Sequence, residues 1–278
     1  MRLKFENNLG TIEMSGGGDD LIRITSIGGL GVPAYERRTY ASYDFDGAVE
    51  SMRRVSVRTI TVGGDITGGI SEAVRLTKIL SRPCKMTIYG SDFEREINVA
   101  ACESQLGEKN KSFVKFALSL TCDDPYFYDS VPIEVGLYIR KKLISSETTL
   151  PAMFSQRTNS ASINIRGDRD IEPIITILGK RNPDETEGKI VIENKVTGAV
   201  FSLLYVPEND EIITIDVSKR TIISDRIGNL INYISDDSFL SDLVIGDEGA
   251  EFITTGYGAT GDISAYIIYQ NKYLEAIV

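Results

Sequence analysis

The sequence predicts a mainly β protein of two domains: an N-terminal β-sandwich-like domain with one packed α-helix, and a C-terminal β-sandwich of jelly-roll type. Hydrophobic and polar residues alternate with a period of two over many short segments, which is typical of strands with one buried face. Residues 1–130 carry 16 basic and 18 acidic side chains, a net charge of −2, whereas residues 131–278 carry 14 and 22, a net charge of −8. Such a step in charge indicates a domain boundary near residue 130.

The clearest strand of the first half spans residues 112–122. Its even-numbered positions include Val114, Phe116 and Leu118, while Lys115 and Ser119 occupy odd-numbered positions. One face of this strand is therefore expected to be buried. Further strands of the first half are predicted at residues 21–26, 85–89 and 96–100.

Residues 53–62 also alternate, but their phase slips part-way along. Val55 and Val57 are in one phase, and Ile60 and Val62 are in the other. A β-bulge near residues 58–59 would reconcile the two phases within one strand.

One helix is predicted over residues 71–80. Ser71 suits the N-cap position, Glu72 complements the positive end of the helix dipole, and Pro83 ends the helix. The glycine-rich stretch 63–69 before the helix lacks the Gly-Lys-Ser/Thr ending of a phosphate-binding loop, so it is interpreted as a connection. The predicted buried face of the helix comprises Ile70, Ala73, Val74, Thr77 and Leu80.

The second half is predicted to consist almost entirely of strands. Turn-rich segments separate them at short intervals, which favours a β-sandwich or a jelly roll. The predicted organisation is therefore a first domain over residues 1–130, a linker or first strand over 131–150, and a sandwich domain over 151–278. The predicted strands of this half are 133–139, 162–166, 174–179, 189–193, 199–206, 211–217, 220–224 and 265–269.

The composition argues against several classes of function. The chain has no histidine, so a Ser-His-Asp or Cys-His pair cannot form within it. Three cysteines, Cys84, Cys102 and Cys122, are too few for a disulfide framework or a zinc site, and we expect reduced, packed thiols. The net charge of −10 disfavours binding to nucleic acid through its phosphates. No cofactor or metal is predicted, and neither a secretory signal nor a membrane-spanning run is found.

The chain between the two halves reads Leu-Ser-Leu-Thr-Cys-Asp-Asp-Pro-Tyr-Phe-Tyr-Asp over residues 118–129. A last alternating strand that runs into this junction resembles the phage distal tail protein family (Dit, the siphovirus tail component). In the second half, residues 163–168 followed by 172–179 are similar to the family's Asn-x-Gly-Asp and Pro-x-Ile-x-Ile-x-Gly pattern. The junction motif comprises Asp124, Pro125, Tyr126, Phe127 and Tyr128.

This resemblance implies a structural function without catalysis. Six copies would form a ring at the tip of a phage tail, joining the tail tube protein to the tail-associated tip protein. The second domain would be galectin-like and project outward, as a platform for receptor-binding proteins or for contact with a cell-wall saccharide of the host. The protein would be assembled in the host cytoplasm and reside in the virion, with neither sequence-specific nucleic-acid binding nor membrane insertion.

Within this interpretation, residues 28–38 form a candidate inter-subunit or tube-facing loop. Glycine and proline are frequent there, which is typical of loops that carry function, although a plain hairpin connection is an equal alternative. The residues singled out are Gly28, Gly29, Gly31, Pro33, Arg37 and Arg38.

Other functions remain open from the sequence. The nearest alternative is a baseplate hub of a contractile tail or of a tail-like bacteriocin. A carbohydrate-binding module would be a monomer with modest sugar affinity. A glycoside hydrolase would depend on a pair of carboxylates whose separation the sequence does not reveal.

Overall fold

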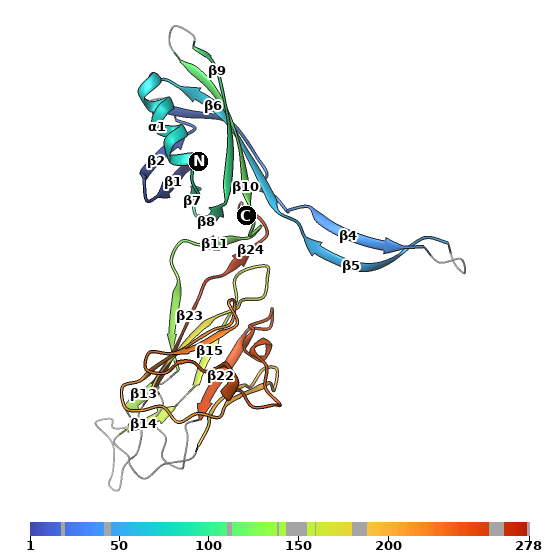
Figure 1. Cartoon of the computed structure of the whole chain (residues 1–278), viewed down its shortest axis with the longest axis vertical. Coiled ribbons are helices and arrows are strands. Elements are labelled where there is room, and N and C mark those ends of the chain that lie inside the picture. Colours follow the sequence, from blue (N-terminus) through green and yellow to red (C-terminus); the bar gives the residue numbers. More distant parts are fainter. Residues whose placement is uncertain are drawn as a thin grey trace. The chain divides into compact units, whose positions relative to one another are not determined.

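The computed structural model of the chain describes residues 1–17, 20–41, 46–109, 113–137, 139–142, 155–158, 160–179, 188–255 and 264–276. It divides into two compact units, each with its own hydrophobic core (Figure 1). Unit 1 comprises Met1–Ser130 and Lys272–Val278, and unit 2 comprises Val131–Asn271. The expected mainly β fold class is confirmed.

Unit 1 is built on one ten-stranded sheet whose strands follow the order β24-β11-β8-β7-β1-β2-β3-β6-β10-β9. Neighbouring strands are antiparallel, except for a short parallel contact between β2 and β3. The elements are β1 (Arg2–Asn7), β2 (Gly10–Ser15), β3 (Ile22–Gly28), β6 (Arg58–Ile66), α1 (Ile70–Leu80), β7 (Cys84–Tyr89), β8 (Glu94–Val99), β9 (Ala101–Lys109), β10 (Val114–Cys122), β11 (Phe127–Asp129) and β24 (Lys272–Tyr273).

The centre of this sheet follows from its sequence pattern. Residues on β10 and β6 that lie opposite each other, such as Leu118 with Val62 and Leu120 with Ile60, share a face and are buried. Gly64 on β6 allows close packing, because a Cβ there would lie 2.1 Å from the Arg23 carbonyl oxygen. The glycine-rich stretch is thus partly strand rather than wholly a connection.

The expected β-bulge at residues 58–59 is wrong. The pairing of β6 with β10 is continuous from Arg58 to Ile66, and the strand before it, β5 (Val49–Val55), belongs to a different sheet. The slip in phase therefore marks the passage between two strands, with Ser56 and Val57 between them. Two strands that bury different faces against different partners need not share a phase.

Helix α1 begins one residue earlier than expected, and its N-cap is Gly69 rather than Ser71. Gly69 makes no side-chain cap and has φ of 81°, a conformation that favours glycine. The buried face also differs from the prediction, because Leu76 and Ile79 are buried whereas Ile70 and Val74 are each 60% exposed. Nowhere in the described ranges is there a helix long and apolar enough to cross a membrane.

Unit 2 is a β-sandwich in which two sheets contribute to one core. One sheet has the order β12-β23-β16-β19-β20-β21, the other has the order β15-β22-β17-β18, and β13 pairs with β14 alone. Inward-facing residues of the first sheet, such as Ile213 and Ile267, share the core with Ile192 and Phe252 of the second. The elements are β12 (Ile133–Gly136), β13 (Ile139–Lys142), β14 (Ser155–Thr158), β15 (Ser160–Ile163), β16 (Ile174–Leu178), β17 (Ile190–Asn194), β18 (Val200–Leu203), β19 (Ile212–Asp216), β20 (Thr221–Ser224), β21 (Gly228–Asn229), η1 (Ile231–Tyr233), η2 (Leu240–Leu243), β22 (Ala250–Thr255) and β23 (Ser264–Tyr269).

The observed division differs from the predicted one at the C-terminus. Residues 272–276 were expected in the sandwich, but they pack in unit 1, where β24 pairs with β11. Unit 2 is thus inserted between two adjacent strands of unit 1. A two-residue strand has almost no periodicity, so its sheet could not be recognised from the sequence.

The three cysteines are free thiols packed in unit 1. Cys84 and Cys122 are buried, and Cys102 is partly buried. Burial raises the pKa of Cys84 and of Cys102 to about 11 and that of Cys122 to about 12, because it disfavours the thiolate.

The raised pKa values of these thiols predict how the free energy of unfolding depends on pH. A free thiol has a pKa of about 8.5 in an unfolded chain, so above that pH the unfolded state loses protons that the folded state retains. Their contribution to stability is therefore complete below about pH 8.5 and lost as the pH rises through about 11 to 12. We expect urea denaturation to show a fall in the free energy of unfolding between pH 8 and pH 11. A triple Cys→Ala variant should show a smaller fall, and an equal fall in both proteins would contradict the assignment.

Unit 2 contains a fully buried carboxylate at Glu211. It accepts hydrogen bonds from the Tyr205 hydroxyl at 2.8 Å, from the Glu208 backbone amide at 2.7 Å and from the Ser224 hydroxyl. Burial, together with the hydrogen bond to Glu211, raises the pKa of Tyr205 above its usual value. The cluster ties the loop before β19 to β20.

Replacement of Glu211 by alanine should therefore destabilise unit 2 strongly. It leaves three donors without their acceptor, among them the buried Ser224 hydroxyl, and we expect a loss of about 3 kcal/mol in the free energy of unfolding. Glu193→Ala is the matched control, because Glu193 pairs only at the surface with Lys195 and should cost less than about 1 kcal/mol. Equal effects of the two substitutions in urea denaturation would show that the buried cluster is not stabilising.

Candidate assembly surface

Unit 1 carries a two-stranded hairpin, named here the arm, that joins no larger sheet among the residues that the structure describes. It consists of β4 (Tyr35–Tyr40) and β5 (Val49–Val55), which pair only with each other, and Figure 1 shows it extending away from the ten-stranded sheet. Nearly all its residues are exposed. An isolated two-stranded hairpin is at best marginally stable in water, so the arm requires another source of stability.

Polar contacts connect the two strands in the part of the arm nearest the sheet. On one face, Arg37 donates to the Glu50 carboxylate at 2.7 Å, and the Arg53 guanidinium lies 4.2 Å from the centre of the Tyr35 ring. On the other face, Arg54 donates to the Glu36 carboxylate at 2.6 Å. Exposed ion pairs of this kind contribute about 0.2–1 kcal/mol each, too little to hold a hairpin in place.

The far part of the arm exposes apolar side chains on one face. Tyr40 lies opposite Val49 and Arg38 lies opposite Met52, with a register shift between the two pairs. Arg38 and Tyr40 are two apart on β4 and share a face, so both pairs lie on this face, with Arg38 at its inner end. Tyr40 is 56% exposed, Val49 37% and Met52 41%. These three side chains, Tyr40, Val49 and Met52, are named the arm patch.

The root of the arm is organised by a buried arginine, Arg58, which is 3% exposed. Its guanidinium donates to the carbonyl oxygens of Gly29 and Gly31, both at 2.7 Å, and to those of Pro125 and Leu274, both at 2.6 Å. It also lies 4.5 Å from the centre of the Phe127 ring. Burial lowers the pKa of Arg58, but arginine remains charged in proteins, so the carbonyl dipoles must compensate for lost water.

Gly29 is required at this root. Its φ is 84°, and a Cβ there would lie 2.2 Å from the Thr59 carbonyl oxygen. Both the conformation and the close approach exclude other residues. The chain can therefore pass beside the start of β6 and present the Gly29 and Gly31 carbonyls to one guanidinium.

The junction motif forms the other side of this root. The Asp124 carboxylate accepts hydrogen bonds from the Tyr128 hydroxyl at 2.6 Å and from the Tyr126 amide at 3.2 Å. The Pro125 carbonyl binds Arg58, and the Phe127 ring is fully buried beneath the guanidinium. The junction motif at the end of the first domain is thus a turn that is stabilised by hydrogen bonds between its own residues.

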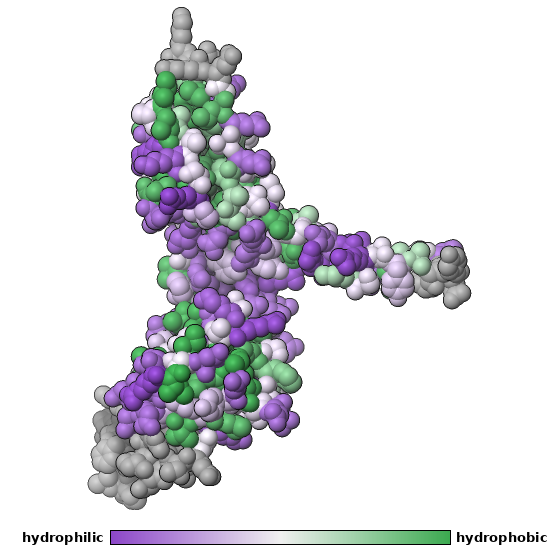
Figure 2. Space-filling view, in the orientation of Figure 1, coloured by the Kyte–Doolittle hydropathy of each residue, from purple (hydrophilic) through white to green (hydrophobic). Residues whose placement is uncertain are grey.

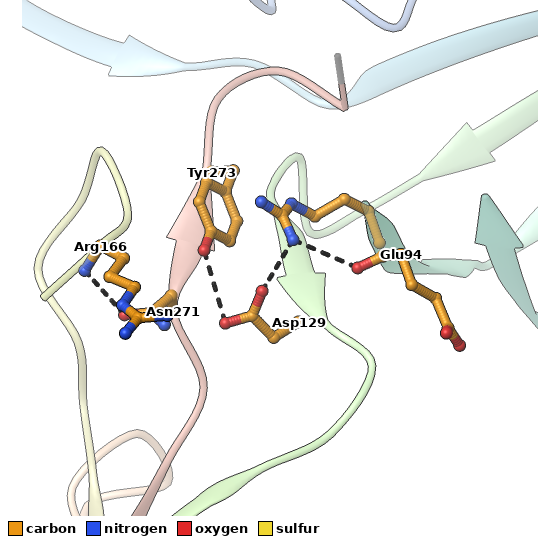
Figure 3. A network of polar contacts seen from close by, with 6 residues as sticks. Glu94, Asp129, Arg166, Asn271 and Tyr273 are labelled. Atoms are coloured by element: carbon orange, nitrogen blue, oxygen red, sulfur yellow. Dashed lines mark hydrogen bonds and ion pairs between the residues drawn. The ribbon is translucent and has the colours of Figure 1, made fainter. Parts of the chain in front are cut away.

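The C-terminal strand β24 is held beside this turn by a second set of contacts (Figure 3). Arg95 donates to the Asp129 carboxylate at 2.8 Å, the Tyr273 hydroxyl lies 3.4 Å from the other Asp129 oxygen, and the Arg95 guanidinium lies 3.7 Å from the Tyr273 ring centre. Figure 3 also shows Asn271, whose side chain within unit 2 accepts a hydrogen bond from the Arg166 amide at 3.1 Å.

Unit 1 also has an apolar recess between α1 and the edge strand β9, named the helix groove. Its volume is about 570 Å³. Ile70, Val74 and Leu106 contribute its exposed hydrophobic surface, at 60%, 60% and 46% exposure. Figure 2 shows hydrophobic surface gathered over this part of the unit. Val114, Thr77 and Lys78 complete its lining together with Ala73, Ser81 and Gly107.

The residues predicted for a loop at 28–38 fall in two parts. Gly28 ends β3, Gly29 and Gly31 accept hydrogen bonds from Arg58, and Pro33 is buried, so residues 28–34 form the root of the arm. Arg37 and Arg38 instead lie on strand β4. Sequence reasoning missed the arm patch and the central role of Arg58. The signal available was the unexplained slip in phase around Val57.

Comparison with known proteins gives no match to any family model and none to a curated protein sequence. Among solved structures, the Dit protein of SPP1, described as a paradigm of the hub adsorption apparatus in phages that infect Gram-positive bacteria, is similar. The TM-score is 0.66 at 13% identity, over 97% of this chain and 98% of that one. This chain has the fold of a Dit protein. A chain of the phage P2 baseplate in its activated conformation with calcium also matches, with a TM-score of 0.50 at 14% identity, over 96% and 98% of the two chains.

The expected resemblance to phage distal tail proteins is thus confirmed at the level of the fold. The match to SPP1 Dit extends over both units of the chain. At 13% identity, the agreement lies in the arrangement of elements rather than in shared side chains.

Replacement of Arg58 by alanine should loosen the root of the Dit-like unit 1. Four carbonyl groups would lose their donor, and we expect a loss of at least about 3 kcal/mol in the free energy of unfolding. Arg58→Lys should not rescue it, because one ammonium cannot reproduce the planar fork that reaches four carbonyls. Arg54→Ala, which removes an exposed pair on the arm, is the control and should change stability by less than about 1 kcal/mol.

Hydrogen exchange would locate the effect. Amides of residues 29–34 and 272–276 should lose protection in Arg58→Ala, while those of unit 2 should not change. A variant as stable as the parent chain would show that Arg58 does not hold the root together.

Proposed function

We propose that this chain is a distal tail protein, the structural hub at the tip of a phage tail. The observation that carries the proposal is the match to SPP1 Dit across both units at once, over 97% and 98% of the two chains. A β-sandwich alone would support many functions, because common folds host unrelated activities. The combination of the ten-stranded unit with an inserted sandwich is much more restrictive.

In this proposal, unit 1 forms a ring of six copies at the end of the tail tube. One face of the ring binds the tail tube protein, and the other binds the tail-associated tip protein. The root of the arm, with Gly28, Gly29, Gly31 and Pro33, and the strand residues Arg37 and Arg38 are candidates for contact with a neighbouring subunit or with the tube. The function is mechanical and calls for no catalytic group.

The distribution of charge supports a ring built from unit 1. Unit 1 carries 17 basic and 19 acidic side chains, a net charge of −2, whereas unit 2 carries 13 and 21, a net charge of −8. Six copies would carry 6 × −10 = −60 in total. Because most of this charge belongs to unit 2, repulsion between neighbouring copies of unit 1 is modest.

Unit 2 serves as the outward platform in this proposal. Its sandwich is inserted between β11 and β24, so it can present loops to receptor-binding proteins or to a cell-wall saccharide without interrupting the sheet of unit 1. The protein would be assembled in the host cytoplasm and reside at the tail tip of the virion.

The test is the state of assembly of the purified full-length chain. We expect native mass spectrometry to detect a species of six copies, and negative-stain microscopy to show rings with a central channel. Labelling of virions with an antibody against the chain should mark the tail tip. A chain that stays monomeric at high concentration, and forms no ring with the adjacent tube and tip proteins, would refute the proposal.

A further inference from the structure

Two apolar surfaces of unit 1 lack an occupant among the described residues: one lies on a projecting hairpin and the other lines a recess. The arm patch is an apolar face on a projecting hairpin, formed by Tyr40, Val49 and Met52. The helix groove is an apolar recess of about 570 Å³, within the range of roughly 300–1,000 Å³ that is typical of binding pockets. None of the residues that line the groove belongs to the arm.

The arm patch cannot fill the groove of its own chain. In Figure 1 the arm extends to the right of the ten-stranded sheet, whereas α1, which lines the groove, lies to the left of it. Within the described part of the chain, the hairpin pairs with no third strand. A marginal hairpin of this kind becomes ordered when its apolar face is buried against another surface.

The tip of the arm and the helix beside the groove carry charges of opposite sign. At the tip of the arm, from Tyr40 to Glu50, the sequence contains three acidic residues and no basic one, whereas Arg38 and Arg53 flank Met52 at the inner end of the arm patch. Residues 70–82, which include the helix that lines the groove, contain three basic residues and one acidic residue, a net charge of +2. Opposite potentials favour the approach of these two surfaces and suppress contact between two arms or two helices.

A second copy of this chain is the partner that these features fit. A closed ring uses head-to-tail contacts, which require two different and complementary patches on every subunit. The chain carries both patches, one on the arm and one on the opposite side of the same unit. We propose that the arm patch of one copy packs into the helix groove of the next copy, so that Met52 contacts Val74 and Leu106 around the ring. This inference rests on the proposed ring and specifies its contact.

The first test is site-specific cross-linking in the full-length chain. Met52→Cys combined with Val74→Cys, treated with a short bis-maleimide, should give a ladder of covalent multimers. The native thiols are a weak background, because two are buried and the third is partly buried. The control is Thr39→Cys with Val74→Cys, since Thr39 lies on the opposite face of the arm, and it should give no ladder. A ladder from the control alone, or from neither pair, would overturn the proposed contact.

The second test uses charge. Met52→Lys and Val74→Lys should each raise the concentration needed for half assembly by at least about tenfold, whereas Thr39→Lys should leave it unchanged. Both sites are exposed in the single chain, so circular dichroism of each variant should match the parent chain. Mixing the two defective variants leaves one intact arm and one intact groove per pair, so native mass spectrometry should detect dimers of the two variants and no rings.

The outcomes separate this inference from the proposed function. Rings in the parent chain together with normal assembly of Met52→Lys and Val74→Lys would refute the arm-to-groove contact and leave the hub proposal standing. Absence of rings in the parent chain, alone and with its tail partners, would refute the hub itself.

Discussion

Unit 1 depends on the compensation of one buried positive charge. The guanidinium of Arg58 is nearly excluded from water, and an unpaired charge there would cost far more than a domain can tolerate. Four carbonyl oxygens and an aromatic face supply the compensation, and they come from the root of the arm, the junction motif and the C-terminal tail. These three segments lie up to 216 positions from Arg58 in the chain. If one of these segments moved, the guanidinium would lose a carbonyl acceptor while remaining buried, which is costly in free energy. Arg58 therefore fixes the position of the root of the arm.

Stability is distributed very unequally over unit 1. Strands β6 and β10 bury alternate residues in the core of unit 1, whereas β4 and β5 bury almost nothing. A hairpin of that kind opens locally at little cost unless a partner covers it. The root of the arm is stable whereas the arm itself is not. This arrangement suits a chain that assembles, because the root sets the direction of the arm before the arm contacts another subunit.

The two points at which the chain passes between unit 1 and unit 2 are also held by contacts within unit 1. The chain leaves unit 1 after Ser130 and returns at Lys272, and β11 and β24 lie side by side at these two points. Asp129 contacts Arg95 and lies near Tyr273, so both crossing segments are held by the same small cluster. The sandwich has a separate core with its own buried carboxylate at Glu211. Its loops can therefore vary without a change in the sheet that carries the arm.

Much of the local structure could be read from the sequence. Alternation located the strands of both units, the isolated helical period located α1, and the Asp-Pro-aromatic junction located the end of the first unit. The prediction failed where the pattern was short or ambiguous. The slip around Val57 predicts a bulge where the structure has two separate strands, and the sequence predicts Ser71 as the N-cap although Gly69 occupies that position. The apolar face of α1 was misassigned because Ile70 and Val74 suit a core as well as they suit a groove.

The sequence by itself determined the mainly β class, the two-part organisation and the absence of any histidine-based chemistry, because these follow from periodicity and composition. Only the tertiary structure decided that residues 272–276 belong to unit 1, that Arg58 is buried among carbonyls, and that Tyr40, Val49 and Met52 share an exposed face. Each of these depends on contacts between segments far apart in the chain or on the register of two strands. A local sequence pattern does not specify which carbonyl group or strand from a distant part of the chain will lie next to a given residue.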